Sequence, residues 1–338
     1  MPRSDGENKY PCACSSVNVV SRLSSTLSIH QFRALSSVQC DANALLQNCP
    51  TLLEEKATAE TIAGDDYRGH YLAKYPNPTH IIFYVYGGGF VSGSAGSVMP
   101  YLLQLSVELQ ARGLKADMFV AEYDLAPEHP YPGALRQVVS AYQYIARRNL
   151  PIILVGDSAG GNLCLGLLRH LVKPHPSIPP LTQNQGETGH AVAACLNSPW
   201  VNLRNNGDSY RQNANQDCLD KGALDRWRKA YLDGKPLDEY VNPIDCLDGW
   251  KEILPKDTLL VAGELELFLA DIQKLARNQS GYSNIEMHVE PKKGHVSSMV
   301  DFGVTQPGLP VARVGQEEDH THSGIHLQAD WIVDKCRV

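Results

Sequence analysis

Short runs of apolar, β-branched residues recur along the chain, and each is long enough for one buried strand. The runs are Ile81–Tyr86, Asp117–Tyr123, Pro151–Gly156, Ala191–Ser198, Asp257–Ala262 and Ile285–Glu290. The helix-length segments between many of them are Met99–Arg112, Gly133–Arg148, Ala159–Val172 and Ala270–Gln279. Strands that alternate with helices predict an α/β fold, in which helices cover both faces of a mostly parallel sheet.

Two regions interrupt this alternation. Residues 1–65 are polar at first and then helical in pattern, with Ser-rich stretches and no clear strand. Residues 200–250 form a long excursion between two strands, rich in Asn, Asp, Tyr and Trp, with a helix expected at Ala223–Leu232. Long insertions of this kind often build a lid or a binding wall. Near the end of the chain we expect a loop at residues 303–322 and an amphipathic helix at Ile325–Cys336.

Composition excludes several classes of protein. The chain has 338 residues, of which 43% are hydrophobic and 20% are charged, as is typical of a globular protein with one large domain or two ordinary ones. Thirty basic and 37 acidic side chains give a net charge of −7, which disfavours nucleic acid as a partner. No apolar run approaches the roughly 20 residues that a membrane span requires.

The cysteines and the start of the chain bear on localisation. No apolar stretch typical of an export signal follows Met1–Tyr10. The nine cysteines are scattered and odd in number, without the spacing of a zinc site, and Cys12 and Cys14 are too close for a usual metal knuckle. We therefore expect reduced thiols in a cytoplasmic protein.

One motif carries catalytic chemistry. Gly156–Gly160 fits the pattern G-x-S-x-G, with a predicted strand directly before it and a predicted helix, Gly161–His170, after it. In a nucleophile elbow the turn is so sharp that the residues two before and two after the serine must be small, and Gly156 and Gly160 meet that condition. Ser158 is therefore the candidate nucleophile. The alternatives are a phosphate-binding loop, which the absence of a following Lys disfavours, and a simple turn.

A second glycine cluster, Tyr86–Phe90, follows the strand at 81–86. Consecutive glycines leave backbone N–H groups open to a ligand. An acyl-transfer enzyme needs such donors for the oxyanion of its tetrahedral intermediate, and the N–H of Ala159 would be a second source. The alternative is a flexible turn.

Four motifs together resemble the hormone-sensitive-lipase-like branch of the α/β-hydrolases. They are Tyr86–Phe90, Tyr123–Pro132, Gly156–Gly161 and Ser198–Leu203. The resemblance spans roughly residues 65–300 and implies an eight-stranded core. It divides the chain into an N-terminal helical cap segment at 1–65, a first core part at 66–199, a cap insertion at 200–250 and a second core part at 251–338. It also implies hydrolysis of a carboxylic ester of a small molecule, without metal or organic cofactor.

Two further points follow from this resemblance. Fungal members of the branch often act on acylated natural products, which suggests secondary metabolism. The family's glycine motif usually begins with His, where this chain has Tyr86. The substitution leaves the glycine N–H donors in place and puts the detailed geometry of the loop in question. The alternative for Tyr86 is a plain core aromatic.

The order of a hydrolase triad is Ser, acid, His, and the acid should follow a late strand. After the strand at 257–262 there are three candidates, Glu264, Glu266 and Asp271. The family pattern has an apolar residue two positions after the acid and a carboxylate five positions after it. Glu266 meets this spacing with Phe268 and Asp271, whereas Glu264 does not.

The candidate general base is His295, which follows the strand at 285–290 in the loop where the family keeps this residue. A rival group, His320, His322 and His326, lies in and after an acidic loop. Because these histidines lack the regular spacing of metal ligands, we interpret the segment as a solvated loop and not as a metal site.

The resemblance assigns the roles. His295 takes the proton of Ser158 while Glu266 orients the imidazole. The oxyanion hole consists of the amides of Gly88, Gly89 and Ala159, with Gly87 supporting the turn. Candidate substrate-binding residues are Phe90, Trp200, Tyr210 and Trp227, each of which could equally be core. Acyl transfer, lactone cleavage or amide hydrolysis would use the same residues. A small-ligand receptor without turnover, as in the gibberellin receptors of this branch, is the alternative from another class.

Overall fold

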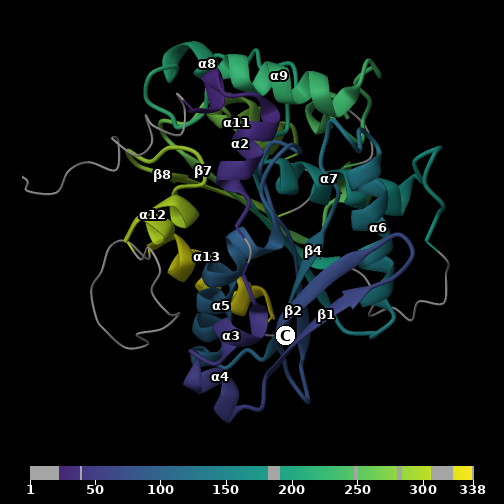
Figure 1. The fold of residues 1–338 in the computed structure, drawn as a ribbon, viewed down its shortest axis with the longest axis vertical. Coiled ribbons are helices and arrows are strands. Elements are labelled where there is room, and N and C mark those ends of the chain that lie inside the picture. The colour runs from purple at the N-terminus through teal and green to yellow at the C-terminus, as the bar shows by residue number, and fades with distance from the viewer. Residues whose placement is uncertain are drawn as a thin grey trace, which may run out of the picture.

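An eight-stranded sheet forms the centre of the molecule in a computed structural model, which describes residues 23–38, 40–181, 191–246, 250–279, 284–305 and 323–336 (Figure 1). The strand order is β1-β2-β4-β3-β5-β6-β7-β8. β1 and β2 run antiparallel to their neighbours, and all other pairs are parallel. The strands are β1 Thr58–Ala63, β2 Arg68–Lys74, β3 His80–Val85, β4 Ala116–Glu122, β5 Ile152–Asp157, β6 Ala191–Asn197, β7 Asp257–Gly263 and β8 Asn284–Glu290.

Helices cover both faces of this sheet (Figure 1). On one face α5 packs against α12 and α13, and on the other α6 packs against α7. The helices are α2 Ile29–Ser36, α3 Ala42–Leu46, α4 Pro50–Glu54, α5 Ala95–Ala111, α6 Gly133–Ala146, α7 Ser158–Val172, α8 Ser209–Gln212, α9 Lys221–Leu232, α10 Trp250–Ile253, α11 Leu269–Gln279, α12 Ser297–Thr305 and α13 Ser323–Cys336, with a 3-10 turn, η1, at Pro243–Asp245. The expected mostly parallel α/β architecture is confirmed.

The six strands expected from apolar runs are all present, with ends that shift by one residue. All six residues of β5 are buried, as are five of the six in β3. Strands that are covered on both faces read as continuous apolar runs, which explains why these were visible in the sequence.

The expectation of no clear strand in residues 1–65 is wrong, because β1 lies there. None of the six residues of β1 is buried, and β1 is one of the two edge strands of the sheet. Its sequence, TAETIA, therefore lacks the continuous apolar run by which the other strands were recognised. Helix α12 also extends two residues past the start of the expected loop at residue 303. Its Phe302 packs edge-on against Tyr101 of α5, with ring centroids 5.9 Å apart, and this tertiary contact supports the helix.

Segments from the two regions that interrupt the alternation lie together at one end of the molecule, where α2 is close to α8 and α9 (Figure 1). The ring of Phe32 in α2 stacks on that of Trp227 in α9, with centroids 5.4 Å apart. The Arg226 side chain donates to the carbonyls of Ser24 and Ser25, at 2.5 and 3.1 Å. Arg33 attaches α2 to the core through the Val91 carbonyl, at 2.8 Å. These contacts agree with a two-part cap, and the four-part division of the chain stays a prediction.

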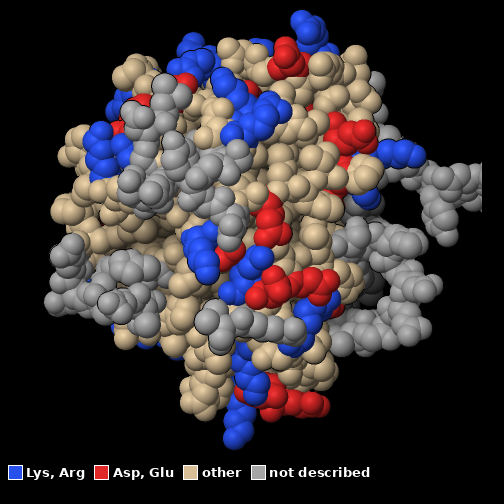
Figure 2. Space-filling model, turned by 180° about the vertical axis from the view of Figure 1, so that it is seen from behind, with Lys and Arg blue, Asp and Glu red and all other residues tan. Residues whose placement is uncertain are grey.

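The charges on one face, the state of the cysteines and the hydropathy of the helices bear on the expectations from composition. On the face drawn in Figure 2, basic and acidic side chains are interspersed. None of the seven described cysteines forms a disulfide. Among the helices that the structure describes, none combines the length and the apolar character needed to cross a bilayer.

Candidate active site

Ser158 lies at the sharp turn between β5 and α7. Its φ is +52°, a left-handed conformation that a non-glycine residue rarely adopts and that often marks a functional position. Ser158 is the first residue of α7, where the partial positive charge of the helix N-terminus stabilises negative charge. The local sequence thus produces the elbow that the motif predicts.

Close packing explains why the elbow needs small residues. A Cβ atom added to Gly160 would lie 2.0 Å from the carbonyl oxygen of Val85, and one added to Gly156 would lie 3.0 Å from the carbonyl carbon of Gly160. Backbone from β3 and from the turn itself occupies the space that a side chain would need. Substitution at either glycine would therefore displace Ser158.

His295 meets Ser158 from the loop after β8. Its Nε2 lies 2.9 Å from the Oγ of Ser158, within hydrogen-bond distance, and the imidazole is buried. Burial lowers the pKa of His295 below its ordinary value of 6.5. The ring is therefore neutral at pH 7, and a neutral Nε2 facing a serine hydroxyl can accept its proton.

Glu266 is the carboxylate that faces His295. Its Oε2 lies 3.9 Å from Nδ1 of His295, and the Glu266 side chain is fully buried. Burial raises the pKa of Glu266, and the negative charge of Asp217 raises it further. The 3.9 Å separation is longer than a hydrogen bond, as is common for catalytic contacts without bound substrate.

The two rival carboxylates point elsewhere. Glu264 is exposed, and its Oε2 accepts from the backbone N–H of Lys292 at 2.8 Å. The Oδ1 of Asp271 accepts from the side-chain amide of Asn202 at 3.1 Å. Of the three candidates, only Glu266 therefore lies beside the histidine.

Two residues that the sequence analysis did not single out support this arrangement. The Ser198 hydroxyl donates to Oε2 of Glu266 at 2.6 Å and accepts from the N–H of Val296 at 3.1 Å. Asp217 accepts from the N–H of His295 at 3.0 Å and from that of Leu267 at 2.7 Å. Ser198 begins one of the family-like motifs, whereas Asp217 has no signal in the sequence.

The glycine loop lies directly against the elbow. The N–H of Gly87 donates to Oδ1 of Asp157 at 3.0 Å, and the Tyr84 hydroxyl donates to the same oxygen at 2.7 Å. Gly88 and Gly89 have φ values of +117° and +62°, which favour glycine. Burial raises the pKa of Asp157 to about 6, although these bonds lower it. Asp157 thus ties the glycine loop to the residue before Ser158.

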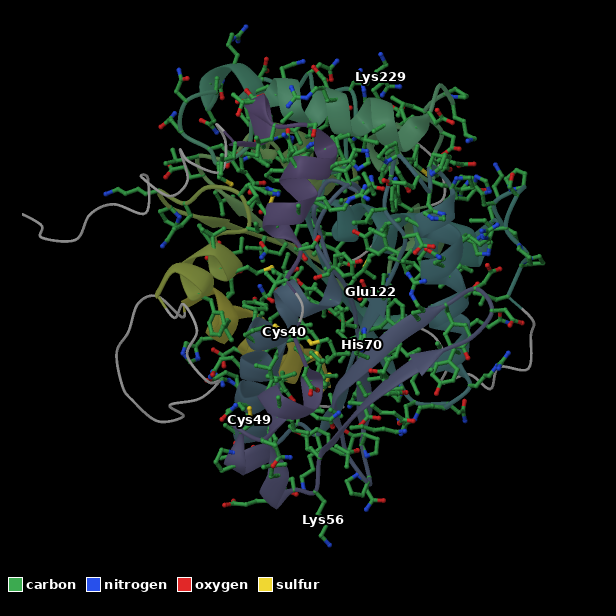
Figure 3. All side chains as sticks on the ribbon, in the orientation of Figure 1. Cys40, Cys49, Lys56, His70, Glu122 and Lys229 are labelled. Carbon is green, nitrogen blue, oxygen red and sulfur yellow. The ribbon has the colours of Figure 1, made fainter. Side chains whose placement is uncertain are left out.

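Tyr86 holds the start of this loop. Tyr86 donates its hydroxyl proton to the carbonyl of Tyr123 at 3.2 Å, and Tyr123 donates to the carbonyl of Tyr86 at 2.9 Å. Their rings are stacked, with centroids 4.5 Å apart. Glu122 accepts from the Tyr86 hydroxyl at 3.3 Å and lies beside His70 of β2 (Figure 3). Tyr86 is therefore a core aromatic and also a hydrogen-bonding support of the loop.

Aromatic side chains surround the candidate triad. Phe90, Trp200 and Phe268 stack in a row, with successive centroids 5.7 Å apart, and Phe268 meets the His295 ring edge-on at 4.9 Å. A Cβ atom on Gly89 would lie 2.4 Å from the Trp227 ring, so α9 packs directly on the glycine loop.

Trp200 and Tyr210 were proposed from the sequence as substrate-binding residues. In the structure, the polar group of each side chain forms a hydrogen bond with another residue of the protein. The indole N–H of Trp200 and the hydroxyl of Tyr210 each donate to Oδ1 of Asn205 at 2.9 Å. Both side chains are buried, as are Phe90 and Trp227. These contacts fit core residues under the site, and substrate binding by the four residues stays a prediction.

The rival histidine group is only partly described. His320 and His322 lie outside the described residues. The Nδ1 of His326, in α13, lies 3.3 Å from Oε2 of Glu108 and 3.2 Å from Nη2 of Arg112, both in or at the end of α5. Its described contacts are therefore those of a residue that joins two helices.

Comparisons with known proteins identify the family. A model of the alpha/beta hydrolase fold family matches residues 82–299. An esterase of Acinetobacter venetianus is 32% identical over 247 residues, which cover 71% of this chain and 74% of that one. Hormone-sensitive lipase of Ictidomys tridecemlineatus is 38% identical over 245 residues, 68% of this chain but only 29% of the lipase.

Solved structures share the fold. The crystal structure of EstE5 soaked with p-nitrophenyl butyrate has a TM-score of 0.72 at 19% identity and covers 97% of this chain and 100% of that one. An esterase of the bacterial hormone-sensitive lipase family has a TM-score of 0.69 at 20% identity, and the match covers 97% of this chain and 99% of that one. The chain belongs to the α/β-hydrolase family, in its hormone-sensitive-lipase-like branch. The expected fold and the expected enzyme class, a carboxylic ester hydrolase, are confirmed.

Proposed function

We propose that this chain is a serine hydrolase that cleaves a carboxylic ester of a small or medium hydrophobic substrate through an acyl-enzyme. The observation that carries the proposal is the 2.9 Å contact between Nε2 of His295 and Oγ of Ser158, at a strained elbow on a helix N-terminus. A nucleophile and a base within hydrogen-bond reach are the core of covalent acyl transfer.

In the first step, Ser158 attacks the ester carbonyl while His295 takes the hydroxyl proton. Glu266 stabilises the imidazolium that forms and selects the tautomer with the proton on Nδ1. For this, Nδ1 of His295 and Oε2 of Glu266 must approach from 3.9 Å to hydrogen-bond distance. Nδ1 has no other partner among the described residues, so His295 gives up no hydrogen bond at that atom in the movement.

The backbone N–H groups of Gly88, Gly89 and Ala159 stabilise the oxyanion. Gly87 cannot contribute in this geometry, because its N–H is bound to Asp157. Ala159 is the second residue of α7, and the first N–H groups of a helix lack partners within the helix. Each donor of this kind is worth about 3 kcal/mol in barrier height.

Collapse of the tetrahedral intermediate then releases the alcohol, which takes its proton from His295. A water molecule, deprotonated by the same histidine, cleaves the acyl-enzyme and returns Ser158 to its starting state. The aromatic side chains around the site favour an apolar acyl or alcohol group over a charged one.

A covalent probe is expected to separate enzyme from receptor. A fluorophosphonate should modify Ser158 stoichiometrically, because His295 activates the hydroxyl, and peptide mass spectrometry should locate the adduct there. The His295→Ala variant should not be labelled, whereas His326→Ala, a matched change outside the site, should be labelled like wild type. If the wild-type protein is inert to the probe but binds small ligands tightly, the receptor alternative replaces this proposal.

The acidic limb of the pH profile is expected below pH 6.5. Turnover needs neutral His295, and burial lowers its pKa below the ordinary value of 6.5, so protonation stops the reaction only at lower pH. The measurement is kcat/KM of the free enzyme from pH 4 to pH 9 with an uncharged ester. A limb with its midpoint above pH 7 would contradict this and would assign the limiting proton to Glu266, whose pKa is raised.

A further inference from the structure

The loop that carries Glu266 is held by the cap insertion. Three side chains at intervals of four residues, Ser209, Asn213 and Asp217, contact its backbone. Ser209 donates to the Leu267 carbonyl at 2.5 Å, and Asn213 donates to the Glu266 carbonyl at 2.9 Å. Asp217 accepts from the N–H of Leu267 at 2.7 Å. The position of the candidate acid thus depends on a segment outside the strands of the sheet.

Asp217 alone among these three also reaches the loop of the candidate base. Its Oδ1 accepts from the N–H of His295 at 3.0 Å and from that of Cys218 at 2.7 Å, while its Oδ2 binds Leu267. One carboxylate therefore joins the backbone of the candidate base to the residue after the candidate acid. Because Asp217 is only 4% exposed, water does not compete strongly for these bonds.

The chemistry of Asp217 is specific to a carboxylate. Two oxygens accept three N–H groups, and among the described residues no Lys or Arg forms an ion pair with it. Its charge is also unfavourable for Glu266, because it raises the pKa of that nearby carboxyl. An amide in its place would remove the repulsion but would turn an NH₂ group toward at least one backbone N–H.

We infer that Asp217 is a positioning residue for ester hydrolysis, which sets the distance between the loops of Glu266 and His295. This inference rests on the proposed function of Ser158, Glu266 and His295. The loops need such a connection because Nδ1 of His295 and Oε2 of Glu266 lie 3.9 Å apart, so a small change in loop position decides whether they can pair. A misplacement of about 1 Å at a catalytic group can cost about 10²-fold in rate.

The test compares Asp217→Asn with Asp208→Asn, a matched change at an exposed residue of the same insertion. Titration with a fluorophosphonate counts the reactive serines in each preparation, and kcat for p-nitrophenyl butyrate is expressed per labelled serine. We expect kcat per site to fall about 100-fold in Asp217→Asn, with KM within about threefold of wild type. Asp208→Asn should match wild type in both constants.

Asp217→Glu is the second variant, because it retains both acceptor oxygens. Its kcat per labelled serine should be at least about tenfold higher than that of Asp217→Asn. If the amide variant does not fold, Asp217→Glu is compared with wild type instead. If Asp217 had only a structural role, a variant that folds would contain fewer serines that react with the fluorophosphonate, but kcat per labelled serine would equal that of wild type. This result, in either variant, would overturn the inference. If Ser158→Ala turns over ester as fast as wild type, the proposed site itself fails. If Ser158→Ala is inactive and Asp217→Asn turns over normally, only the role of Asp217 fails.

Discussion

Ser158→Ala is expected to abolish ester turnover while the protein stays folded. The variant removes the hydroxyl that lies 2.9 Å from His295, and loss of a triad serine costs about 10⁶ in rate. Ser158 is buried, but the change to Ala removes a single oxygen atom and leaves the backbone of the elbow intact, so thermal unfolding should be nearly unchanged. The measurement is hydrolysis of p-nitrophenyl esters, with circular dichroism as the check on folding.

Ser177→Ala is the matched control for this variant. Ser177 is exposed, and its described hydrogen bond, to His175, uses only the backbone N–H. The control should keep wild-type turnover. If a clean preparation of Ser158→Ala kept more than a few per cent of wild-type activity, Ser158 would not be the nucleophile, and the elbow would need a different interpretation.

Glu266→Gln is expected to reduce turnover by several orders of magnitude. The variant keeps the shape of the side chain but removes the charge that stabilises the imidazolium and selects its tautomer; the equivalent change in a serine-protease triad costs about 10⁴. The fully buried side chain makes this loss severe, because no water can replace the missing charge. Steady-state kcat for a p-nitrophenyl ester measures the effect.

Glu264→Gln is the matched control, two residues away in the same loop. Its exposed side chain contacts the Lys292 N–H and not His295, so turnover should change by less than about tenfold. The opposite pattern would identify Glu264 as the triad acid. Mild effects in both variants would indicate Asp271 or a site that depends little on its third member.

The local patterns of the sequence were sufficient to predict much of the fold. Strands β3 to β7 were visible because most of their residues are buried, whereas β1, with no buried residue, was not. The elbow at Ser158 could be predicted for a similar reason. A strand, a tight turn and a helix follow one another within about twenty residues, and their requirements for small residues are local.

The local patterns could not predict which side chains from distant segments of the chain contact each other. Glu264 and Glu266 lie in one loop. The local sequence could not show that Glu264 faces solvent while Glu266 is fully buried beside His295. The family spacing favoured Glu266, and the tertiary structure supplies the physical reason: Ser198 and Gly263 bind its Oε2, at 2.6 and 3.1 Å.

The sequence by itself determined the order of the core strands and helices, the strained turn at Ser158 and the glycines that approach it, because each depends on neighbours in the chain. Only the tertiary structure decided which carboxylate meets His295 and that Asp217, 78 residues before it, binds its backbone. The direction of a loop side chain depends on contacts with distant segments, and these exist only once the sheet has formed and residues 209–217 have packed on the loop after β7.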